Sequence, residues 1–220
     1  MAKHLHRDLE DLSKDILTLG GRVEDAINKA IAALVERRPE LVQEVIAGDL
    51  AIDRQELEVE DKCLKILALH QPVAADLRFV ITVLKVNNDL ERMGDHAANI
   101  AGRAQSLSTH NPIETAGRLQ DMAAKVRSMV HDSLDALVSK DTAKARQVVL
   151  MDEEVDEAHR QMYPLIQDLM REDPTTIERA IWSLGVSRHL ERIADLATNI
   201  AQDLVFMVEG EIVRHRGPRI

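Results

Sequence analysis

Apolar residues recur at intervals of three and four along most of the chain, which is the spacing of one face of an α-helix. One long series runs through the middle of the chain: Leu77, Val80, Ile81, Leu84, Leu90, Met93, Ala97, Ile100 and Ala104. Polar and charged residues fill the positions between them. We therefore expect amphipathic helices that bury one face and expose the other.

Prolines and short polar segments divide this pattern into six stretches. Four prolines stand between stretches, where proline commonly occupies a first helical turn: Pro39, Pro72, Pro112 and Pro174. The predicted helices cover residues 4–37, 39–70, 73–107, 112–139, 141–172 and 174–208. All are longer than an average globular helix, which favours a helical bundle.

Local signals refine the ends of these helices. Asn111 can cap the fourth helix, with Pro112 in the first helical position and Glu114 three residues after the cap. Asp173 precedes a proline in the same way at the start of the sixth helix. We expect Pro164 to kink or break the fifth helix, because a proline inside a helix loses a hydrogen bond and clashes with the preceding turn.

An internal repeat indicates how the helices are organised. Residues 90–101 read LERMGDHAANIA and residues 190–201 read LERIADLATNIA, so most residue types recur at the same spacing. Such agreement predicts a tandem duplication of a three-helix unit. We therefore expect an all-α chain with one antiparallel three-helix bundle in residues 1–108 and a second in residues 109–220.

Composition excludes several classes of protein. Aromatic residues make up only 2% of the 220 residues, which disfavours strands. The formal net charge is -10, so the chain would repel phosphate backbones and nucleic acid is not an expected partner. The single cysteine cannot form an internal disulfide, and no stretch approaches the roughly 20 apolar residues of a membrane span. We expect a cytoplasmic protein.

Each half contains two pairs of carboxylates spaced four residues apart, which places both members of a pair on one helical face. The pairs are Asp49 with Asp53, Glu91 with Asp95, Asp152 with Asp156 and Glu191 with Asp195. Asn99 and Asn199 follow one turn later. Like charges at this spacing repel, and a bound cation would reverse the sign. The alternative is a solvated acidic face on which Arg92 and Arg192 neutralise their neighbours.

Oxygen ligands of this kind suit hard cations, and the spacing alone does not choose among iron, manganese, magnesium, calcium and zinc. Redox catalysis is disfavoured, because carboxylate-bridged di-iron bundles use Glu-x-x-His on two helices and this motif is absent. His159 follows Asp156 by three residues, but only once. The chain also lacks a glycine-rich phosphate loop and a nucleophile elbow, so we expect no catalytic site. A carboxylate bundle with redox or metal-storage activity is the alternative function.

At the repeated LER-x-x-D-x-x-x-N-I motif the sequence resembles the PhoU family, whose members consist of two three-helix bundles. The resemblance extends nearly from end to end of the chain. It includes GGRVEDAI at residues 20–27, ADLR at residues 75–78 and the closing VEGEIVRH at residues 208–215.

The resemblance implies a cytoplasmic, non-enzymatic negative regulator of phosphate uptake and of the phosphate-starvation response. The implied partners are the ATPase of the phosphate ABC transporter, a sensor histidine kinase and a second copy of the chain in a homodimer. Contact with the membrane would then occur only through partners.

The resemblance also implies multinuclear iron or zinc clusters on the bundle surface, with manganese and magnesium as further candidates. The implied ligands are Asp49, Asp53, Glu91, Asp95, Asp152, Asp156, Glu191 and Asp195, with Asn99 and Asn199 as additional ligands or bracing groups. Three features depart from the family pattern. ADLR has no good second copy, and the histidine after the motif aspartate is present only as His96. Tyr163 occupies the position of Glu60, so we expect the second metal site to be the weaker one.

Overall fold

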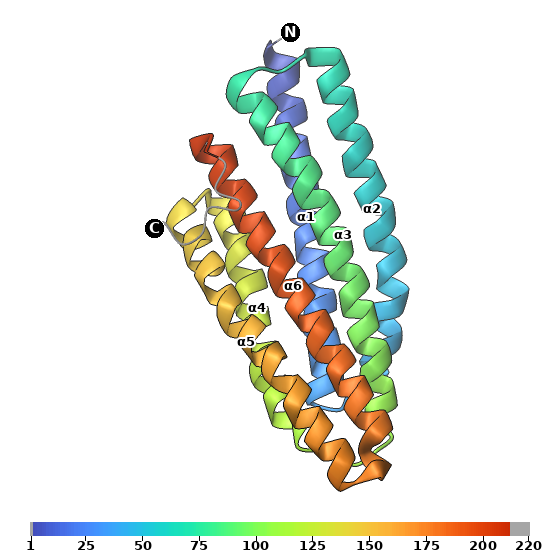
Figure 1. Ribbon diagram of the computed structural model, residues 1–220. Coiled ribbons are helices and arrows are strands. Elements are labelled where there is room, and N and C mark those ends of the chain that lie inside the picture. The colour runs from blue at the N-terminus through green and yellow to red at the C-terminus, as the bar shows by residue number, and fades with distance from the viewer. Residues whose placement is uncertain (1, 212–220) are drawn as a thin grey trace.

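The computed structural model describes residues 2–211, and it contains six long helices (Figure 1). They are α1 (Ala2–Val35), α2 (Glu40–His70), α3 (Ala74–Ser108), α4 (Thr115–Ser139), α5 (Thr142–Glu172) and α6 (Ile177–Glu209), with a short 3-10 helix, η1 (Pro174–Thr176), before α6. No strand occurs among the described residues. The predicted all-α fold is confirmed, and residues 212–215 of the closing VEGEIVRH segment lie outside the described range.

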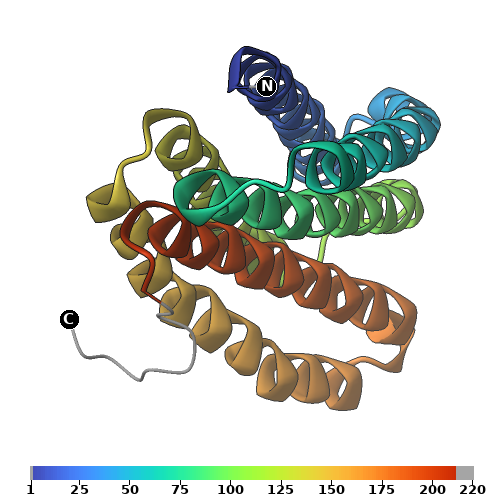
Figure 2. The same cartoon turned by 90° about the horizontal axis from the view of Figure 1, so that it is seen from above.

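α3 and α6 form the centre of the molecule. They run antiparallel side by side, with α1 and α2 against α3, and with α4 and α5 against α6 (Figures 1 and 2). Equivalent apolar residues of the two repeated motifs are fully buried in these helices: Leu90, Met93, Ala97, Ile100, Leu190, Ile193, Ala197 and Ile200. They belong to one continuous core, so the division into two bundles at residues 108 and 109 stays a prediction.

The segment before α4 differs from the sequence prediction. α4 begins at Thr115, three residues later than expected, and no side chain caps it. The guanidinium of Arg37 donates to the backbone carbonyl oxygens of Ser108 (2.7 Å) and His110 (2.6 Å). Arg179 donates to the carbonyl oxygen of Asn111 (3.1 Å). These bonds hold the segment in a non-helical conformation, which explains why the expected cap does not form.

Pro164 lies inside α5, and the helix continues without a break from Thr142 to Glu172. Of the two outcomes expected at Pro164, a kink or a break, the break is therefore wrong. Pro164 and Arg160, whose carbonyl would accept the missing hydrogen bond, are both exposed. Water can replace that bond at an exposed position, so the helix tolerates the proline there.

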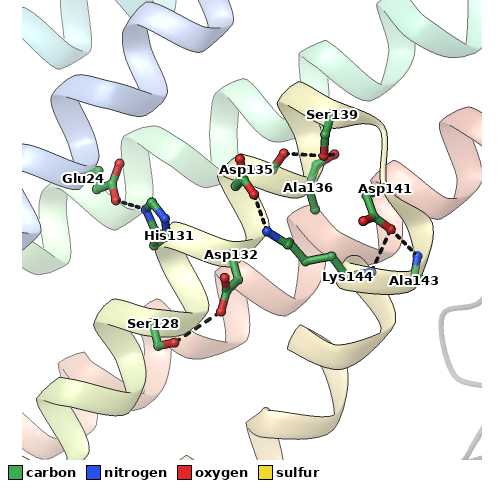
Figure 3. Close-up of polar contacts among 10 residues, drawn as sticks. All are labelled: Glu24, Ser128, His131, Asp132, Asp135, Ala136, Ser139, Asp141, Ala143 and Lys144. Carbon is green, nitrogen blue, oxygen red and sulfur yellow. Dashed lines mark hydrogen bonds and ion pairs between the residues drawn. The ribbon is translucent and has the colours of Figure 1, made fainter.

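The turn between α4 and α5 is closed by hydrogen bonds on both sides. Oδ1 of Asp141 accepts from the backbone N–H groups of Ala143 (2.9 Å) and Lys144 (3.0 Å), which caps α5 (Figure 3). Lys140 ends α4 in the left-handed conformation, with φ at 57°. The N–H of Asp141 donates to the carbonyl oxygen of Ala136 (3.1 Å). This turn keeps α4 and α5 antiparallel.

Polar contacts also join the two groups of helices. Nδ1 of His131 on α4 lies 2.9 Å from Oε1 of Glu24 on α1 (Figure 3). Nζ of Lys85 on α3 lies 3.3 Å from Oδ1 of the buried Asp203 on α6. None of the described helices combines the length and the apolar character that crossing a membrane requires.

Candidate metal centre

Three of the predicted carboxylates converge in the second half of the chain. Asp152 and Asp156 lie one turn apart on α5, and Asp195 comes from α6. One oxygen atom from each lies within 4.8 Å of the other two. Ala194 and Ala197 are fully buried beside Asp195. Their burial fixes the rotation of α6, so that the carboxylate of Asp195 lies at the edge of the core next to α5.

The electrostatics of this cluster fit a divalent cation. Burial and the nearby charges of Asp195 and Asp156 raise the pKa of Asp152 to about 6. Oδ1 of Asp152 and Oγ1 of Thr198 are both buried without a well-formed hydrogen bond among the described residues, although the Thr198 hydroxyl lies close enough to Asp152 to offset part of the rise in its pKa. A cation would supply the missing positive charge and would coordinate oxygen atoms of a type it prefers.

A cavity of about 390 Å³ adjoins the cluster. Asp152, Asp195 and Asn199 all line it, so the amide of Asn199 faces the same space as two of the carboxylates. Arg192 also lines this cavity, and its Nη1 lies 3.2 Å from Oδ2 of Asp195. Arg92, from the first half of the chain, completes the basic side of the cavity.

Glu191 is the one predicted ligand of the second half that is not among the three converging carboxylates. Its Oε2 lies 3.4 Å from Nε of Arg192. Burial and the charge of Asp195 raise the pKa of Glu191. Glu191 therefore borders the cluster and is paired with an arginine.

The four predicted ligands of the first half face one another across α2 and α3. Burial and the charges of Asp53 and Asp95 raise the pKa of Asp49, and burial followed by the charge of Asp95 raises that of Glu91. No group of three ligand atoms as close as that of the second half occurs among the described residues of α2 and α3. The amide of Asn99 donates to the backbone carbonyl of Asp95 (2.7 Å), so it braces the helix.

The geometry favours the second half as the stronger metal site, whereas the sequence predicts that the second site is the weaker one. Tyr163, which stands where the first half has the acidic Glu60, was the reason to expect a weaker second site. Tyr163 instead packs edge-to-face on His159, with ring centroids 5.3 Å apart. His159 in turn lies 3.0 Å from the hydroxyl of Ser187 through its Nδ1. Neither Tyr163 nor His159 is part of the converging group, so the loss of one acidic side chain there leaves the cluster complete.

Sequence reasoning missed Thr198 as a member of this centre. The repeat itself concealed it, because the equivalent position of the first motif is Ala98, which carries no ligand atom. Arg92 and Arg192 occupy the same place in both motifs, so their recurrence was the available signal for the basic side of the cavity.

Comparison with known proteins agrees with the repeat and the fold. The sequence profile described as the PhoU domain matches residues 16–104 and 119–204, one copy in each half. The chain belongs to the PhoU family. It is 40% identical over 212 residues to the "Phosphate-specific transport system accessory protein PhoU homolog" of Aquifex aeolicus, and the match covers 96% of each chain.

Other members of the PhoU family match over a similar length. The PhoU homolog of Caulobacter vibrioides is 36% identical over 219 residues, which cover 99% of this chain and 95% of that protein. The crystal structure of PhoU from Pseudomonas aeruginosa superposes with a TM-score of 0.91 at 34% identity, covering 94% of this chain and 99% of that one. PhoU from Streptococcus pneumoniae gives a TM-score of 0.87 at 33% identity.

Proposed function

We propose that the chain is a non-enzymatic negative regulator of phosphate uptake and of the phosphate-starvation response in the cytoplasm. In this proposal it acts as an adaptor between the ATPase of the phosphate ABC transporter and a sensor histidine kinase. The observation that carries the proposal is the match over nearly the whole chain to proteins named as accessory proteins of phosphate-specific transport.

The structure supports an adaptor in two ways. Six long helices offer extended surfaces on which a partner protein can dock, and charged side chains on them supply electrostatic complementarity. The region that best resembles a chemical site is the carboxylate cluster of α5 and α6, and its chemistry is that of cation binding. Regulation by protein contact therefore requires no reaction step.

We further propose that the cluster of Asp152, Asp156 and Asp195 holds a divalent cation, with iron or zinc as the first candidates and manganese or magnesium as alternatives. The support is the close approach of three carboxylates, one of which, Asp152, has a buried oxygen atom without a hydrogen bond. A cation there would join α5 to α6, so its occupancy would change the shape or rigidity of the second half.

The regulatory role is tested in the organism that encodes the chain. After deletion of the gene, a phosphate-starvation reporter should be expressed even in high phosphate, and the wild-type chain supplied from a plasmid should repress it again. A reporter that stays repressed in the deletion strain would contradict the role. Immunoblotting for the plasmid-encoded chain controls for its expression.

The proposed partners need a separate measurement, because repression alone does not identify them. The tagged chain should retain the transporter ATPase and the sensor histidine kinase in pull-downs from cells grown in high phosphate. Light scattering of the purified chain should give the mass of a homodimer, twice 24.6 kDa. A monomeric mass would remove the homodimer from the proposal without affecting the rest.

A redox or metal-storage role is the competing function for the same carboxylates. It predicts oxygen consumption by the iron-loaded protein in the presence of a reductant, or the uptake of many iron atoms per chain. The regulatory proposal expects neither activity, and expects cation binding to saturate at a few ions per chain.

A further inference from the structure

A second cavity lies between α3, α5 and α6, and basic residues dominate its lining. Its volume is about 550 Å³. Four arginines and two histidines line it: Arg92, Arg103, Arg188, Arg192, His96 and His189. None of the described residues that line it is acidic. On a chain with a net charge of -10, this is a local reversal of sign that would attract a small anion.

Two of these arginines have no partner among residues 2–211. Arg103 and Arg188 form neither an ion pair nor a hydrogen bond there, and Nε of Arg103 is buried. The backbone at Gly185 makes room for this guanidinium, since a Cβ atom at Gly185 would lie only 2.5 Å from Nε and 2.8 Å from Cζ of Arg103. A buried N–H donor of a charged group that lacks a hydrogen-bond partner destabilises the folded state. A bound ligand with acceptor oxygen atoms would therefore be favourable at this site.

The positive charge of the cavity comes from the arginines alone. Burial and the neighbouring charge of Arg92 lower the pKa of His96. Burial, with His96 and Arg103 next to it, lowers the pKa of His189 to about 4. The two rings meet with their Nδ1 atoms 3.3 Å apart, which suits one neutral donor and one neutral acceptor. Four guanidinium groups therefore face the cavity at neutral pH.

We propose that this cavity binds the phosphoryl group of a small-molecule anion. Guanidinium groups carry N–H donors in a planar fork that matches the oxygen atoms of phosphate, and they stay charged at any physiological pH. The inference stands on the geometry of the cavity and goes beyond the proposed regulatory function without depending on it.

The remaining lining indicates what accompanies the phosphoryl group. Tyr163, Ile181 and Leu184 form an apolar wall, and Tyr163 and Ile181 are exposed large side chains. The cavity is far larger than a single tetrahedral oxyanion. A phosphomonoester with a planar or apolar organic part would place its phosphoryl oxygens on the arginines and its organic part on this wall.

The choice of test residues follows from the partners of each arginine. Arg192 is partly neutralised by Asp195, and Arg92 lies 3.8 Å from Asp89, so both have structural roles besides the cavity. Arg103 and Arg188 lack such partners. Replacing these two with glutamine removes anion-binding charge without breaking an ion pair.

The experiment is isothermal titration calorimetry of the full chain at an ionic strength of about 0.15 M, with adenosine monophosphate and with inorganic phosphate as probes. We expect the wild type to bind at least one probe. Arg103→Gln/Arg188→Gln should weaken the dissociation constant by about tenfold or more. Gly185→Ala, which leaves the charge unchanged, should also weaken it by displacing the Arg103 guanidinium.

The matched control is Arg22→Gln/Arg54→Gln, which removes two exposed arginines from α1 and α2 and changes the net charge equally.

Binding of the nucleotide alone would identify the ligand as a phosphomonoester. Equal binding of inorganic phosphate would identify it as the free anion. Both outcomes support the cavity as an anion site. The absence of heat with either probe, or equal weakening in the control, would overturn the proposal. Because binding is measured on the purified chain, its failure leaves the regulatory role, measured in cells, untouched.

Discussion

At the residue scale, Asp152 shows how function and stability oppose each other in this protein. Its carboxylate is half-buried, faces two other carboxylates and has one oxygen atom without a hydrogen bond. Spacing predicted that Asp152 and Asp156 share a helical face. It did not predict that only Asp195 would join them from α6, because that convergence depends on the packing of two helices.

We predict that Asp152→Asn has effects of opposite sign on stability and on metal binding. In chelator-treated protein the amide removes like-charge repulsion, so the melting temperature should rise, with a gain in unfolding free energy on the order of 1 kcal/mol after allowance for solvent screening. The same change removes a charged ligand and should weaken cation binding by at least about tenfold. Calorimetry with and without chelator measures both effects, and a fall in the apoprotein melting temperature would contradict the account.

Glu209 makes the stability of the folded chain depend on pH. The guanidinium of Arg146 donates to both carboxylate oxygens, at 2.9 and 2.7 Å, and this lowers the pKa of Glu209 to about 2. A carboxyl group with a depressed pKa stabilises the folded state above its unfolded pKa and loses that contribution as the pH falls toward the folded pKa.

Glu209→Gln should therefore lower the unfolding free energy at pH 7, by less than about 1 kcal/mol because the pair is exposed. The difference from wild type should persist down to the unfolded pKa of a glutamate, about 4.3, and should shrink as the pH falls further toward 2. Thermal melts across this range measure it. Glu172→Gln, at the exposed end of α5, is the control; a Glu209→Gln difference that grows at acid pH would argue against the pair.

At the element scale, the apolar spacing was sufficient to predict each of the six helices, but their exact ends depend partly on tertiary contacts. Asp141 caps α5 through its own side chain, so a local signal was sufficient there. The start of α4 was misplaced because Arg37 and Arg179 bind the preceding carbonyl oxygens from distant helices. Pro164 was expected to kink or break α5; the helix does not break there, because the exposure of Pro164 makes the lost hydrogen bond replaceable by water.

The turn between α4 and α5 gives a paired prediction about stability. Asp141→Ala removes two hydrogen bonds to the first turn of α5 and should cost about 1 kcal/mol. Lys140→Gly relieves a left-handed conformation at the end of α4, so it should be neutral or slightly stabilising. Chemical denaturation of the two variants measures both changes. Equal destabilisation by the two substitutions would show that the turn is not held as described.

At the scale of the whole molecule, the repeat predicted two similar units, and the structure shows how closely they are joined. α3 and α6 carry the repeated motifs and pack against each other along one continuous core. The basic cavity could not be predicted from the repeat, because only Arg92 and Arg192 recur between the motifs, whereas Arg103, Arg188 and His189 do not. Only the antiparallel contact of α3 and α6 brings these residues together.

The shared core leads to a prediction about folding. The full chain should unfold in a single cooperative transition, because separating the halves would expose the apolar faces of both α3 and α6. A fragment of residues 1–108 should be less helical per residue and prone to association. Calorimetry and circular dichroism of the chain and the fragment measure this; two well-separated transitions in the full chain would instead support two independent bundles.

The most direct test of the account is the metal content of the purified chain, because the convergence of Asp152, Asp156 and Asp195 is the central structural claim about its site. Elemental analysis should compare wild type with Asp152→Asn/Asp195→Asn and with Glu91→Gln/Asp95→Asn as the matched change in the first half. We predict bound divalent cation in wild type, near-complete loss in the second-half variant and substantial retention in the first-half variant. Wild-type protein that holds no metal after purification without chelator, and takes up none when iron, zinc or manganese is added, would contradict the account.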